Sequence, residues 1–106
     1  MAEAVAFIAG LVPESFERRV TATPQEFARD LRQAWPAVVA DADGLRFSLH
    51  EGAQALVITI EPAGVRRLGL FELPQLDVRF RFGPGEEPAR RALLARLDRG
   101  MQKGGG

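Results

Sequence analysis

The side chains that most often perform chemistry in proteins are scarce in this sequence. His50 is its one histidine, and cysteine and tyrosine are absent. A general base at neutral pH is most often a histidine, so His50 would have to be the base of any such reaction. It closes an alternating segment on the polar side, directly before Glu51-Gly52, a pattern typical of a solvent-exposed hairpin. We therefore retain His50 as a candidate and predict no catalytic residues.

The remaining polar residues do not form a metal or cofactor motif. A single histidine without cysteine leaves carboxylates as the metal ligands, and Asp41 with Asp43 is too sparse for a calcium loop. Gly83-Pro84-Gly85 lacks the Lys-Ser/Thr pair of a phosphate loop, and its proline removes an amide donor. Glu86 and Glu87 stand where a helix begins, which suits the positive end of its dipole. We expect no metal and no cofactor.

Arginine offers the most prominent charged pattern. The candidate surface for an anion or a partner consists of Arg46, Arg79, Arg81, Arg90, Arg91 and Arg96. Sheet-type binders of single-stranded nucleic acid also place aromatic residues on the basic face. Here Phe47, Phe80 and Phe82 alternate with the arginines and must point to the other side. Nucleic acid is therefore an alternative partner, behind a protein partner.

The sequence ends in Gly104-Gly105-Gly106. A C-terminal glycine pair resembles the tail that ubiquitin-like sulfur carriers present for adenylation. In those proteins the glycines follow a strand, whereas here they follow a predicted helix. We expect residues 104–106 to be a flexible tail.

Two segments have the pattern of amphipathic helices. In the first, Thr23-Pro24-Gln25-Glu26 is a capping box, and Phe27, Leu31 and Trp35 then follow at intervals of four. Pro36 disfavours helical geometry at Trp35 and ends this element. In the second, an apolar stripe begins after Pro88, and Gly100 is the expected end. That stripe contains Ala89, Leu93, Leu97 and Met101.

The strands are predicted from alternation with a period of two. Residues 15–22 form the first, and Arg18 interrupts its apolar side, which suggests an edge position or a barrel rim. Further strands are expected at 45–50, 56–60, 65–72 and 76–82. They are separated by turns at Glu51-Gly52 and Glu61-Pro62-Ala63-Gly64, and by a turn or bulge at Leu73-Pro74-Gln75. Val5 to Val12 is either a strand or a short helix. The turns between the predicted strands are too short for a crossover connection, so neighbouring strands must be antiparallel.

These elements predict an α+β fold in two layers, an antiparallel β-meander packed by two amphipathic helices. The order is β-α-β-β-β-β-α, with one further N-terminal strand or helix as an option. Residues 1–103 are expected to form a single domain, which is consistent with the length of 106 residues.

The composition bears on location. The apolar segment from Ala4 to Val12 is too short to span a bilayer, which needs about 20 apolar residues, and it lacks the basic start of a secretory signal. We therefore expect a soluble cytoplasmic protein. The ratio of 13 arginines to 1 lysine is typical of a GC-rich bacterial genome.

Net charge is zero, with −4 over residues 1–62 and +4 over residues 63–106, and we expect the fold to mix the charges of the two halves.

By elimination, the sequence favours a non-catalytic module that binds another protein or itself, through a sheet edge or the arginine-rich face. The alternative is a carrier with a pocket for a small apolar ligand between the helices and the sheet. Binding of nucleic acid or another anion comes third, and membrane binding is not expected.

Overall fold

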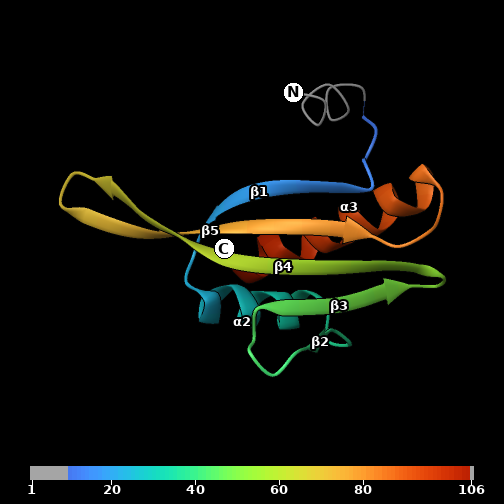
Figure 1. Cartoon of the computed structure of the whole chain (residues 1–106), viewed down its shortest axis with the longest axis horizontal. Helices are drawn as coiled ribbons and strands as arrows, with labels where there is room; N and C mark the ends of the chain where they lie inside the picture. The colour runs from blue at the N-terminus through green and yellow to red at the C-terminus, as the bar shows by residue number, and fades with distance from the viewer. Residues whose placement is uncertain (1–9, 106) are drawn as a thin grey trace.

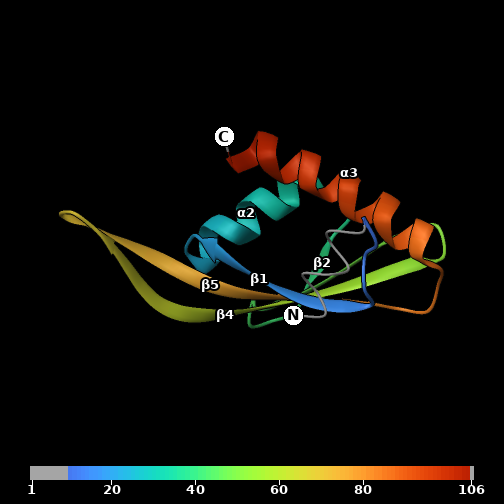
Figure 2. The same ribbon diagram turned by 90° about the horizontal axis from the view of Figure 1, so that it is seen from above.

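The fold is a two-layer α+β sandwich. A computed structural model describes residues 10–105 of the chain, and within them two helices cover one face of a five-stranded antiparallel sheet (Figure 1, Figure 2). The elements are β1 (Ser15–Thr21), α2 (Pro24–Ala34), β2 (Val39–Ala40), β3 (Arg46–Glu51), β4 (Gln54–Leu68), β5 (Phe71–Phe82) and α3 (Glu87–Gly105). The predicted class and element order are confirmed. The N-terminal segment at 5–12 lies largely outside the described residues.

The strand order is β1-β5-β4-β3-β2. Strands β2 to β5 form a meander, and β1 pairs with β5 at the far edge, so α2 must cross the sheet from one edge to the other. The predicted edge position of Arg18 is confirmed. Figure 2 shows both helices on the same side, so within residues 10–105 no helix covers the other face of the sheet.

The core lies between the helices and the inner face of the sheet. Alternate residues of each strand supply it, which is the outcome expected from the period of two. The most deeply buried side chains are Phe47, Leu31, Leu56, Ile58, Leu76, Leu93 and Val78. Most outward residues between them are polar or charged, with Ala55 and Val57 on β4 as exceptions, and two pairs of them form ion pairs across strands.

Helix α2 begins as predicted. The Thr23 hydroxyl accepts a hydrogen bond from the Glu26 amide (3.1 Å), and the Glu26 carboxylate accepts one from the Thr23 amide (2.8 Å). The helix ends at Ala34, and Trp35 takes an extended ψ of 83° before Pro36. Both boundaries therefore follow from local sequence chemistry.

The prediction for residues 61–72 is wrong. Glu61-Pro62-Ala63-Gly64 is not a turn: β4 continues through it to Leu68, with a bulge between Pro62 and Val65. Gly64 takes a φ of 85° at this bulge. The chain instead reverses at Gly69 and Leu70, so the expected strand at 65–72 is divided between two strands. The turn or bulge expected at 73–75 is also wrong, because β5 runs through these residues from Phe71 to Phe82.

The two longest strands extend beyond the rest of the sheet. β1 pairs with β5 only from Ser15 to Thr21, and β3 pairs with β4 only up to Thr59. Beyond these points β4 and β5 continue alone as a two-stranded hairpin, seen projecting at the left of Figure 1. We call residues 63–74 the hairpin arm.

Helix α3 does not end at Gly100, contrary to the prediction. It extends from Glu87 to Gly105, so it includes two of the glycines expected in the tail, while Gly106 lies outside the described residues. A Cβ placed on Gly100 would lie 2.8 Å from the Ala34 Cβ. Gly100 therefore permits close packing of α3 on α2.

Candidate functional site

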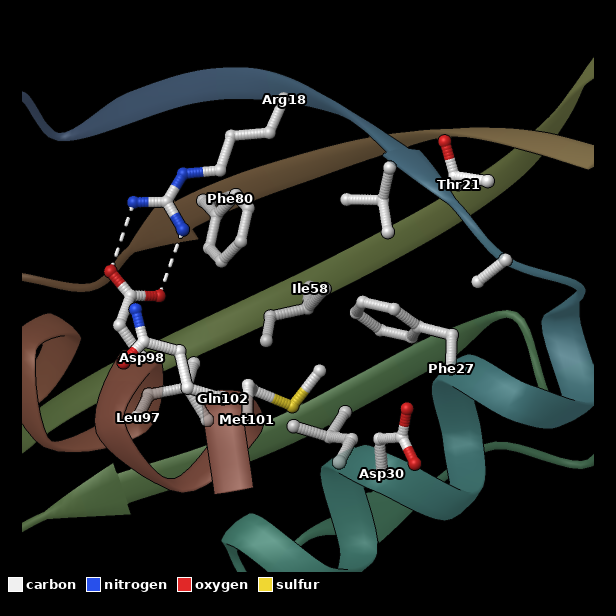
Figure 3. A pocket seen from close by; sticks show the side chains of 13 residues that line it. Arg18, Thr21, Phe27, Asp30, Ile58, Phe80, Leu97, Asp98, Met101 and Gln102 are labelled. Carbon is white, nitrogen blue, oxygen red and sulfur yellow. Dashed lines mark hydrogen bonds and ion pairs between the residues drawn. The ribbon is translucent and has the colours of Figure 1, made fainter. Parts of the chain in front are cut away.

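An open cleft lies between α2, α3 and the β1 side of the sheet. Its volume is about 450 Å³. Figure 3 shows the side chains of Phe27, Ile58, Phe80 and Met101 turned toward this space from four different elements. The cleft is therefore a product of the tertiary fold, because no single segment contains it.

The accessible apolar surface of the cleft comes mainly from its walls. Ile58 at the floor is fully buried and Phe80 is 4% exposed. Val20, Ala22 and Met101 are only partly buried, and they pack against the same core. The cleft therefore presents apolar surface at its sides above a closed floor.

Charged groups surround the mouth. The Arg18 guanidinium donates two hydrogen bonds to the Asp98 carboxylate, at 2.8 and 3.1 Å, and lies 5.2 Å from the centre of the Phe80 ring (Figure 3). Asp30 faces the cleft from α2, and its side chain is 15% exposed. Both carboxylates at the mouth are ion-paired, Asp98 with Arg18 and Asp30 with Arg29, its neighbour on α2, at 3.2 Å.

The hairpin arm is the second candidate site. Every residue from Gly64 to Glu72 is exposed. The exposed fraction is 58% at Val65, 52% at Leu68, 102% at Leu70 and 70% at Phe71. Large apolar side chains in that position are costly to leave in water, and clusters of them mark interaction surfaces.

Local sequence explains the shape of the arm. Gly69 has a φ of 60° at the first position of a two-residue turn, as a type II′ turn requires. Pro62 and Pro74 lie at the base, beyond the last paired residues of β3 and β1, where each strand has an open edge and proline is tolerated. The arm therefore presents side chains at its tip, and its base is protected against addition of another strand.

The six candidate arginines divide between two sides of the sheet. Arg46, Arg79 and Arg81 point outward from β3 and β5, as alternation predicts, because their neighbours are buried toward the helices. Arg79 forms an ion pair with Glu17 on β1 at 2.8 Å. The other three arginines belong to α3 in the helix layer.

The α3 arginines contact their own fold. Arg90 donates to the carbonyl groups of Val12 (2.9 Å) and Gly85 (3.1 Å). Arg91 lies 3.5 Å from a Glu87 carboxylate oxygen. Arg96 forms an ion pair with Glu51, and its guanidinium lies 4.3 Å from the centre of the Trp35 ring. All three residues therefore form hydrogen bonds or ion pairs within the fold, which the sequence pattern did not reveal.

Ion pairs also mix the two oppositely charged halves of the sequence. Arg18 with Asp98, Arg19 with Asp77 and Arg96 with Glu51 each join residues 1–62 to residues 63–106. At these three contacts the negative charges of one half of the sequence lie beside the positive charges of the other half, or the reverse.

His50 is exposed on β3. Its Nδ1 lies 3.3 Å from the carbonyl oxygen of Gly52, across the turn into β4. This is the hairpin position that the sequence indicated, and it is on the outward face, opposite to the helices and the cleft. The sequence analysis offered a pocket between the helices and the sheet as an alternative but named none of its lining residues. It missed the arm, although a glycine at the first position of a two-residue turn, here Gly69-Leu70, is a hairpin signal.

Within residues 10–105, neither helix is long and apolar enough to cross a membrane. No protein-family model matches the sequence, and no curated protein matches it significantly.

Proposed function

We propose that this chain is a non-catalytic protein-interaction module and that the hairpin arm is its contact element. The observation that carries the proposal is the exposure of Leu68, Leu70 and Phe71 at the end of a projecting arm. Aromatic residues such as Phe71 are enriched at the core of protein interfaces, and exposed apolar patches mark interaction sites.

The charge of the arm indicates the chemistry of the partner. The arm contains Arg66, Arg67 and Glu72, and Arg67 and Glu72 form an ion pair with each other at 3.1 Å. Arg66 has no ion pair among the described residues, so the arm has one positive charge to offer. Its partner surface is an apolar groove bordered by a carboxylate.

Site-specific photocrosslinking in the host cell tests this proposal. A photoreactive phenylalanine analogue in place of Phe71 should give protein adducts upon irradiation. The matched control has the same analogue in place of Val39, which is 67% exposed on β2 at the other edge of the sheet. Equal adduct yields from the two positions would reject the arm as the contact element.

The cleft favours a second candidate function, carriage of a small apolar ligand. Its volume of about 450 Å³ lies within the range of roughly 300–1,000 Å³ that is typical of ligand pockets. Native mass spectrometry of the protein from its own host would detect a ligand as an added mass. Filling the cleft with a Met101→Trp substitution should abolish that mass, whereas Arg99→Trp, at an exposed position on α3, should not.

A further inference from the structure

We propose that the cleft of one chain receives the arm tip of a second copy, so that two copies exchange arms. This rests on the proposed function, because it identifies the partner and the surface that the arm contacts. The two complementary parts are present on the same chain. The pairing is therefore between identical copies and can be reciprocal about a twofold axis.

The arm has two different faces. Antiparallel pairing sets Leu68 opposite Phe71, and Arg66 opposite Leu73. Paired residues and those two positions away lie on the same face, so these four residues share one side of the arm. The other side has the paired charges of Arg67 and Glu72. One side of the arm is thus apolar toward the tip, with a single unpaired cation behind it.

The cleft has the matching arrangement. Val20, Ala22 and Met101 provide apolar walls, and Asp30 provides a carboxylate at the mouth, which pairs within the described chain with the exposed Arg29 of its own helix. Arg66 lies two residues behind Leu68, a spacing of ~7 Å along a strand. When Leu68 and Phe71 contact the apolar walls, Arg66 therefore remains near the mouth, where it can pair with Asp30.

The arm of the same chain does not supply this contact. Figure 2 shows the arm extending past the helix layer and away from it, whereas the cleft lies under the two helices. The part of the arm beyond its base is ~15–17 Å long, which is enough to reach into a neighbouring body. In a reciprocal pair each arm crosses to the other copy, and two tips fill two clefts.

The first test is sedimentation velocity of the purified full chain over a wide concentration range. The wild-type chain should form a dimer. Phe71→Glu at the tip and Met101→Trp in the cleft should each raise the dimer dissociation constant by roughly 30-fold or more, because each removes both contacts of the homodimer. The controls Val39→Glu and Arg99→Trp should not change it, and thermal melts verify that every variant is folded.

Mixing the two defective chains gives the decisive result. The Phe71→Glu chain keeps an intact cleft, and the Met101→Trp chain keeps an intact arm. A mixture should therefore form a heterodimer with one engaged arm, although each chain alone is monomeric at the same concentration. Failure of the mixture to associate would overturn the reciprocal exchange.

Charge reversal gives an independent test. Arg66→Asp and Asp30→Arg should each weaken the dimer by about tenfold, and the double variant should recover most of that loss. The same reversal at Arg81, on the outward face of β5, should have no effect. Equal weakening by all three reversals would mean that general repulsion governs association, and would reject the Arg66–Asp30 pairing.

The outcomes separate this inference from the function on which it rests. A dimer that Phe71→Glu breaks and Met101→Trp leaves intact would reject the cleft as receptor and retain the arm as contact element. A monomeric wild-type chain whose position 71 crosslinks to another protein would do the same. A dimer that survives Phe71→Glu would reject the arm exchange, and equal crosslinking from positions 71 and 39 would in addition reject the arm as contact element. A small molecule retained in the cleft, with no effect of Met101→Trp on association, would assign the cleft to a ligand.

Discussion

Gly100 shows how one missing side chain sets the distance between two helices. A Cβ at this position would lie 2.8 Å from the Ala34 Cβ and 3.0 Å from the Ala34 Cα. Glycine inside a helix is less favourable than alanine by about 1 kcal/mol, so local propensity alone would disfavour it here. Tertiary contact reverses that preference, and the glycine that looked like a helix end is instead a packing residue.

Gly100→Ala is therefore expected to destabilise the protein. We expect a loss of about 1–3 kcal/mol in the free energy of unfolding, because the neighbouring Ala34 includes backbone atoms that cannot move aside. Urea denaturation measures the change. In an Ala34→Gly background, which removes the closest of the contacts, the same substitution should cost less. A gain in stability from Gly100→Ala alone would contradict the packing role.

For single charged residues, the sequence pattern predicts the direction of the side chain but not its ion-pair partner. Alternation placed Arg79 and Arg81 on the outward face correctly, and Arg18 on the inward side of an edge strand. Their partners depend on strand order: Glu17 is 62 residues from Arg79, and Asp98 is 80 residues from Arg18. Residue direction is a local property, whereas ion pairing is a property of the assembled sheet and helices.

At the scale of elements, the sequence predicted the ends of a helix correctly where a single strong local motif determines them. The capping box at Thr23 and Glu26 gave the start of α2, and Pro36 gave its end. β2 was missed because two residues are too few to show any period. Pro62 and Gly64 were misread as a turn, since these residue types also suit a bulge on a strand whose neighbour has ended.

The capping box can be tested by removal of its hydroxyl. Thr23→Ala should lower the free energy of unfolding by about 1 kcal/mol, because an amide of the first turn loses its acceptor. Thr23→Ser, which keeps the hydroxyl, is the matched control and should retain most of the stability. Equal losses in the two variants would show that the methyl group of Thr23, rather than its hydroxyl, is important.

The same box makes a small part of the stability dependent on pH. The hydrogen bond from the Thr23 amide lowers the pKa of the Glu26 carboxyl below its ordinary value of 4.5, and the Thr23 side chain adds to this shift. A lowered folded-state pKa means that the contribution is complete above the unfolded pKa and is lost as pH falls through the folded one. Glu26→Gln keeps an acceptor oxygen but does not titrate. As the pH is lowered from neutral to strongly acidic, the urea midpoint of the wild type should therefore fall relative to that of Glu26→Gln. A difference between the two midpoints that does not change with pH would contradict the assignment.

At the scale of the whole molecule, the body and the arm are separable. None of the buried apolar residues of the core lies between residues 61 and 75 of the described chain. The core connects α2 and α3 to the sheet, and the arm extends beyond it (Figure 2). The fold and the proposed contact element therefore depend on different residues.

Removal of the arm should leave the body folded. Replacing residues 64–74 by Asn-Gly closes Ala63 on Gln75 in the register in which Pro62 pairs with Leu76, and it retains Gln75, whose amide group donates to the Thr21 hydroxyl. We expect circular dichroism and a cooperative thermal transition close to those of the wild type, together with loss of association. A chain that no longer unfolds cooperatively would show that the arm is part of the core structure.

The separation of arm and core has a consequence for how such a protein changes over generations. Substitutions at Leu68, Leu70 or Phe71 alter what the arm contacts at little cost in stability, because these side chains are exposed. Core positions such as Leu31 or Ile58 have no such freedom, since they are fully buried. Selection can therefore act on partner choice and on foldedness almost independently, and the same arm could be exchanged between related bodies as a unit of specificity.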